Sequence, residues 1–157
     1  MVDGIVGDVS RNLSEEQRAV WRTYIETSLR LETRLDDSLR SSTGLSMIDY
    51  HLLVLLSEAP GQRLRMGEVA DRMVFSRSRA TYQVDSMQKR GLVVRASEPG
   101  DGRASSAVLT AAGVHALELA APLHAESIHE LFLDELDDED LHHLGDIFGR
   151  LRMRLQN

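Results

Sequence analysis

The stretch SRSRATYQVDSMQKRG, from Ser76 to Gly91, decides the fold. Ser76 is a favourable helix N-cap, and Gly91 suits the left-handed position that follows a helix. Between them, Ala80, Val84 and Met87 recur at spacings of four and three residues, which predicts a helix with one apolar stripe. The opposite side is basic and polar. It carries Arg77, Arg79, Thr81, Tyr82, Gln83, Ser86, Lys89 and Arg90.

A β-hairpin is predicted directly after this helix at 76–90. Residues 92–95 and 105–109 are rich in strand formers, and the sequence EPGDG at 98–102 is typical of a turn. Two helices are predicted upstream, at about 46–58 and 66–73, of which the first is apolar nearly all round its centre.

The two ends of the chain predict long helices with more apolar surface than one core requires. A capping box at Ser14 and Gln17 predicts a helix from 14 to about 40, broken by Ser41–Gly44. A second helix, expected to kink at Pro122, is predicted from 111 to about 135, and a further start follows at Asp137. The last segment has a seam at spacings typical of helix–helix packing, formed by Leu141, Leu144, Phe148, Leu151 and Leu155.

Composition narrows the function classes. The chain has 157 residues, a net charge of −7 and no cysteine, which excludes disulfides, thiolate zinc sites and thiol redox sensing. Residues 61–103 nevertheless hold nine basic and five acidic side chains. This segment therefore has a local positive charge that can attract phosphate, although the chain as a whole is acidic. The start of the sequence does not resemble a signal peptide and no run is long enough to cross a bilayer, so we expect a cytoplasmic protein without a membrane partner.

Helix, short helix, polar-faced helix and hairpin follow one another in the order of a winged helix-turn-helix. We therefore predict a mainly α fold with a small β-hairpin wing, a single chain with its DNA-binding region at 46–110 and dimerisation helices at 14–40 and 111–155. The run from Phe75 to Arg95 resembles the recognition helix and first wing strand of the MarR family. Asp101-Gly-Arg103, followed by Val108-Leu-Thr110, resembles that family's wing signature.

The resemblance implies a homodimer in which each subunit presents a winged helix to half of a pseudo-palindromic double-stranded DNA operator. It implies a transcriptional regulator, a repressor released by a small-molecule effector. Arg103 would enter the minor groove and Asp101 would orient it, while Lys89 and Arg95 would contact phosphates. Candidates for bases or adjacent phosphates are Arg77, Ser78, Arg79, Thr81 and Tyr82. Two positions depart from the family pattern: Tyr82 replaces a common Arg, and Gln83, replacing an aliphatic residue, either reads bases or is partly buried.

The sequence also offers candidate residues for an effector pocket. Trp21, Tyr24 and His51 are candidates to line a pocket for a small aromatic or phenolic effector, although core packing explains Trp21 and Tyr24 as well. The six histidines lack the spacing of a helical zinc pair, so no metal or cofactor is expected. No catalytic motif is present, so no enzyme is expected. The alternative function is a winged-helix protein–protein adaptor without DNA binding.

Overall fold

The computed structural model describes residues 13–98 and 101–156, without the side chains of Glu98 and of 101–104. The chain divides into two units, Met1–Arg34 and Leu35–Asn157, and helix α2 (Glu15–Thr43) runs through both. In the described ranges, no helix combines the length and the apolar character needed to span a membrane.

Helix α2 begins and ends on local signals. The Ser14 amide donates to Gln17 Oε1 at 2.9 Å and the Gln17 amide donates to Ser14 Oγ at 3.1 Å, so the predicted capping box is confirmed. The predicted end near residue 40 was three residues short, because Thr43 continues the helix and donates its hydroxyl to the Leu39 carbonyl. Gly44, at φ 73°, then ends the helix in the left-handed region.

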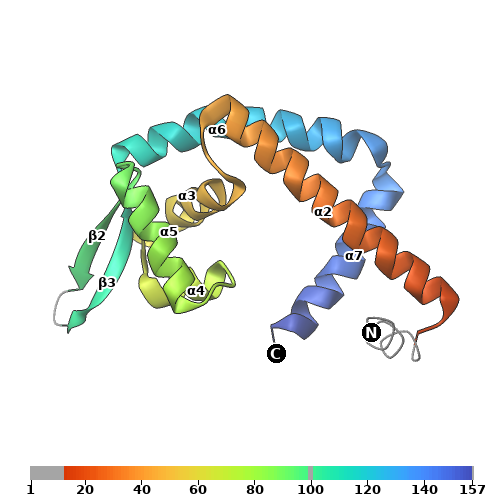
Figure 1. Cartoon of the computed structure of the whole chain (residues 1–157), viewed down its shortest axis with the longest axis horizontal. Helices are drawn as coiled ribbons and strands as arrows, with labels where there is room; N and C mark the ends of the chain where they lie inside the picture. The colour runs from red at the N-terminus through yellow and green to blue at the C-terminus, as the bar shows by residue number, and fades with distance from the viewer. Residues whose placement is uncertain (1–12, 99–100, 157) are drawn as a thin grey trace, which may run out of the picture. The chain divides into compact units, whose positions relative to one another are not determined.

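The middle of the second unit is a helix-turn-helix followed by a hairpin (Figure 1). The helices match the predicted ones to within a residue or two, and the strands are antiparallel. The elements are α3 (Met47–Glu58), α4 (Met66–Arg72), α5 (Arg77–Lys89), β2 (Val93–Glu98) and β3 (Asp101–Leu109).

One strand of the sheet was not predicted. After a short 3-10 turn, η2 (Pro60–Gln62), the strand β1 (Arg63–Arg65) pairs antiparallel with β3, placing Leu64 opposite Ala107. The sheet order is β1-β3-β2. Three residues are too few to show a period of two, so only pairing with a distant partner defines this strand.

Helix α6 (Ala111–Leu131) packs closely on the start of the wing. Thr110 caps it by accepting from the Gly113 amide, and also donates to the carbonyl of Gly91. A Cβ at Gly113 would lie 2.2 Å from the Leu92 carbonyl oxygen, so only glycine permits this approach.

The helix that begins at Ala111 ends earlier than predicted. Helix α6 contains Pro122 but continues past it to Leu131, and the predicted end near 135 was wrong because Phe132 leaves the helical conformation. A 3-10 turn, η3 (Leu133–Glu135), leads to α7 (Asp138–Leu155), so the predicted start at Asp137 is confirmed. Asp137 and Asp140 cap this helix reciprocally.

The core of the second unit is aliphatic and lies around α3. Its buried members come from α3, α4, α5, the sheet, the last turns of α2, the middle of α6 and the connections between these elements. Leu52, Leu53, Leu56, Val84 and Met87 are completely buried.

Candidate nucleic-acid interface

The inner face of α5 is the predicted apolar stripe. Ala80, Val84 and Met87 are fully buried, and Ser76 caps the helix by accepting from the Arg79 amide at 3.3 Å. At 100° per residue, the direction opposite this stripe falls between Ser78 and Tyr82, and Lys89 lies on the same line. All three side chains are exposed, Tyr82 to 75%. These three residues form the outer face of α5.

One flank of α5 borders a hollow. Arg77 and Thr81, one turn apart, line it together with residues of β1, α4 and β3, and its volume is about 550 Å³. Its charged lining residues are Arg65, Glu68, Asp71 and Arg77. Arg77 and Thr81 were predicted site residues, whereas Arg65 and Ser105 were not. For Arg65 the charge was the available signal, but only the pairing of β1 with β3 brings it beside α5.

The other flank of α5 turns toward α3. The Arg79 guanidinium lies over the Phe75 ring, 4.0 Å from its centroid, which orients its charge by a cation–π contact. Gln83 is half-buried and its amide donates to Asp49 Oδ1 at 2.6 Å, so the buried alternative for Gln83 is correct. Arg90 was predicted on the outward face and its side chain is 38% exposed, but its guanidinium donates to Asp49 Oδ2 at 2.7 Å.

The wing is tied to α5 by an ion pair. Arg95 Nε on β2 lies 3.1 Å from Asp85 Oδ1 on α5, and the Arg95 side chain is mostly covered. The predicted phosphate contact of Arg95 would therefore compete with this pair. Strand β3 begins at Asp101, but the side chains of Asp101 and Arg103 lie outside the described residues, and their roles stay predictions.

The candidate effector residues fall in different units. Trp21 and Tyr24 lie a turn apart on α2, with ring centroids 5.7 Å apart, and both are exposed. His51 lies in the buried helix α3, yet its own side chain is exposed. The effector pocket stays a prediction. No group of three or more metal-ligating side chains occurs in the described parts of the chain.

Comparisons with known proteins agree with this geometry. A family model for the MarR family matches residues 43–104, which span α3, α4, α5, β2 and the start of β3. The solved structure of Sco3205, a MarR family transcriptional regulator from Streptomyces coelicolor in complex with DNA, is 37% identical, with a TM-score of 0.89 over 94% of this chain and 92% of that chain. The chain belongs to the MarR family.

Two further relatives agree with this assignment. AbsC, a MarR family transcriptional regulator from Streptomyces coelicolor, is 35% identical, with a TM-score of 0.87 over 94% of this chain and 99% of that one. The HTH-type transcriptional repressor YetL of Bacillus subtilis is 34% identical over 69% of this chain and 66% of its own length. This MarR-family chain is thus related to transcriptional regulators rather than to enzymes, as its lack of catalytic motifs predicted.

Proposed function

We propose that the chain is a sequence-specific regulator of transcription that reads double-stranded DNA with α5 and the wing. The observation that carries the proposal is the outer face of α5, where Ser78, Tyr82 and Lys89 project from a helix whose opposite face is locked into the core. An anchored helix with exposed hydroxyl and basic groups fits the major groove. The relationship to Sco3205, solved in complex with DNA, supports the same reading.

Within this interface the residues would have different tasks. Ser78 and Tyr82 lie at the centre of the exposed face and would reach base edges. Arg77 and Thr81 on one flank and Arg79 on the other would contact bases or adjacent phosphates. Lys89 would bind phosphate, and Arg103, oriented by Asp101, would enter the minor groove.

We further propose that two copies of the chain pair through the dimerisation helices and bind the two halves of a pseudo-palindromic operator. Helix α7 has no buried residue among 138–155, while Phe148, Leu151 and Leu155 on its seam are exposed. On α2, the apolar side chains of Val20, Trp21 and Leu29 are exposed as well. Apolar surface of this extent is typical of a protein–protein interface. The bacterial relatives are consistent with action in the cytoplasm, where bacterial DNA lies.

Regulation by repression, with release by a small aromatic or phenolic effector, completes the proposal. The relative YetL is named a repressor, and the exposed rings of Trp21 and Tyr24 offer stacking surface. Titration calorimetry with benzoate and phenol on the wild type and on Trp21→Ala and His51→Ala tests this. Equal binding by all three proteins would remove both residues from the pocket.

The central experiment selects bound duplexes from random DNA and then measures the affinity for the selected and a scrambled duplex. Tyr82→Ala is expected to weaken binding to the selected duplex about tenfold and to leave scrambled DNA unaffected, because a lost base contact costs roughly 1–3 kcal/mol of discrimination. Lys89→Ala should weaken both and reduce the log–log salt slope by about 0.9.

Arg150→Ala is the matched control, since it removes one exposed positive charge from α7, away from its seam. It should leave both affinities unchanged. A wild-type protein that binds no duplex selectively, even at low salt, would contradict the proposal and favour the adaptor.

A further inference from the structure

A buried carboxylate lies behind the recognition helix. Asp49, the third residue of α3, is 5% exposed and belongs to the core rather than to the surface. Its Oδ2 accepts from the Ser46 amide at 2.9 Å, and the Asp49 amide donates back to Ser46 Oγ at 3.0 Å. Up to this point Asp49 is the acid of an ordinary capping box.

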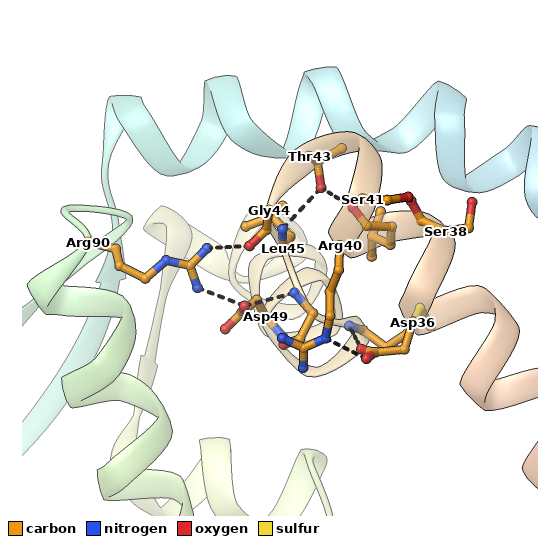
Figure 2. A network of polar contacts seen from close by, with 12 residues as sticks. Asp36, Ser38, Arg40, Ser41, Thr43, Gly44, Leu45, Asp49 and Arg90 are labelled. Atoms are coloured by element: carbon orange, nitrogen blue, oxygen red, sulfur yellow. Dashed lines mark hydrogen bonds and ion pairs between the residues drawn. The ribbon is translucent and has the colours of Figure 1, made fainter.

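The same carboxylate also binds the side chains of Gln83 on α5 and of Arg90, the C-cap residue directly after α5. Gln83 Nε2 donates to Oδ1 at 2.6 Å and Arg90 Nη1 donates to Oδ2 at 2.7 Å. Arg90 Nη2 donates in addition to the Gly44 carbonyl at 3.0 Å, at the end of α2. Figure 2 shows the Arg90 guanidinium reaching these two acceptors from α5, with Asp49 at the start of α3.

The carboxylate is charged in the fold. Burial by itself would raise the pKa of Asp49, but the hydrogen bonds from Arg90 and from Ser46 outweigh it and hold that pKa below its ordinary value. An ionised group in the core is tolerated only while its partners stay in place. Asp49 therefore constrains where Gln83 and Arg90 can lie.

The spacing of the two partners lets Asp49 restrict the rotation of α5. Gln83 and Arg90 are seven residues apart, about 10 Å along one flank of α5. Two fixed points on one flank resist rotation of the helix about its own axis. A rotation of about 20° would move atoms at the helix surface by about 2 Å, which is enough to break a hydrogen bond to a base.

The first turn of α3 is held from a second side. The Met47 amide donates to Asp36 Oδ1 at 2.7 Å, and Arg40 binds the same carboxylate of Asp36 (Figure 2). The turn that carries Asp49 is thus fixed to the end of α2, and α5 is fixed to that turn. Asp49 therefore lies in a helical turn that is itself held in place by α2, and its contacts with Gln83 and Arg90 position α5 relative to that turn.

We propose that Asp49 is a positioning residue for DNA recognition: through Gln83 and Arg90 it sets the rotation of α5, and so the discrimination between operator and other DNA, without touching DNA. The proposal rests on the proposed function. It gives Arg90, the basic residue that caps the end of the recognition helix, the task of binding Asp49 of α3 instead of a phosphate. It makes discrimination, not general affinity, the property that depends on Asp49.

The test compares the affinity for the selected duplex with that for scrambled DNA. Asp49→Asn keeps the size of the side chain and removes the charge that binds Arg90. It is expected to reduce the ratio of the two affinities about tenfold, with the affinity for scrambled DNA and its salt slope unchanged. Arg90→Lys keeps the positive charge but cannot donate to Asp49 and Gly44 at once in the planar geometry of a guanidinium. It should reduce the same ratio, and the double variant should be no worse than Asp49→Asn alone.

Asp140→Asn is the matched control. Asp140 is also the third residue of a capped helix and accepts from the Asp137 amide, but it belongs to α7. Its replacement should lower stability without changing the ratio. Equal loss of discrimination in Asp140→Asn would mean that a capping acid acts only through stability, and would overturn the proposal.

Two further outcomes separate a failure of the Asp49 proposal from a failure of the proposed function. If Asp49→Asn does not fold, Gln83→Met removes one of the two contacts with a side chain of similar length, and a several-fold loss of discrimination is expected. A wild-type ratio in Asp49→Asn, or in Gln83→Met where the former is unfolded, would overturn the proposal while leaving the proposed function intact. If the wild type itself shows no discrimination, both fall.

Discussion

Helices α3 and α7 are both rich in leucine, but they differ in how far their leucines are buried. In α3, Leu52, Leu53 and Leu56 are completely covered by the chain's own core. In α7, which is half as long again, no residue is buried, and Leu151 and Leu155 are 46% and 83% exposed. The difference shows that an apolar pattern in a helix does not by itself determine whether the chain buries that helix in its own core.

The largest effect is expected in α3. Leu53→Ala should lower the free energy of unfolding by about 3 kcal/mol, because it leaves a cavity in a fully packed site. Urea denaturation measures this, and the change should be the same at low and high protein concentration. A loss below about 1 kcal/mol would mean that the core around α3 is loosely packed.

A smaller effect of a different kind is expected in α7. Leu151→Lys should raise the dissociation constant of the dimer at least about tenfold, since it places a charge where a leucine would be desolvated. Sedimentation velocity over a range of concentrations measures it. His143→Lys adds the same charge on another side of α7 and should leave assembly unchanged. Equal assembly of wild type and Leu151→Lys would remove α7 from the interface.

An isolated exposed apolar residue provides a third comparison. Val74, in the turn before α5, is 90% exposed and has φ 55°, a conformation that strains any residue with a Cβ. Val74→Gly should therefore raise the free energy of unfolding by about 1 kcal/mol and the melting temperature by about 3 °C, with no change in assembly. Val74→Ala keeps the Cβ and should gain little. A gain as large in Val74→Ala would assign the effect to lost side-chain exposure instead of backbone strain.

The smallest effect concerns pH. The pKa of Asp49 is depressed in the fold, because hydrogen bonds from Arg90 and Ser46 outweigh burial. Its stabilisation is therefore present above the ordinary aspartate pKa of about 4 and is lost as pH falls through the lower folded value. Urea midpoints between about pH 5 and pH 3 should fall more steeply for the wild type than for Asp49→Asn. Parallel curves would show that the Asp49 carboxylate gains no net stabilisation from its partners.

The faces of α5 show which parts of the candidate site could be predicted from the sequence. The stripe of Ala80, Val84 and Met87 is buried and Tyr82 is exposed, as the periodicity predicted. The flanks could not be predicted in this way, since a helix has the same period whichever neighbour covers it. Arg90 was predicted as an outward basic residue and is exposed, but only the structure shows that its guanidinium binds Asp49, 41 positions earlier.

By itself, the sequence determined the order of helices and wing, the caps at Ser14, Ser76 and Asp137, and the inner face of α5. The caps and this face depend on residues within a turn or two of one another. The tertiary structure alone decided that β1 joins the sheet, that Arg65 borders the hollow beside α5, and that a buried Asp49 binds both Gln83 and Arg90. The strand pairing and the contacts of Asp49 join segments more than 30 positions apart, as for Gln83 and Asp49 at 34, and Arg65 reaches α5 only through that strand pairing. Only packing of the whole unit brings these residues together.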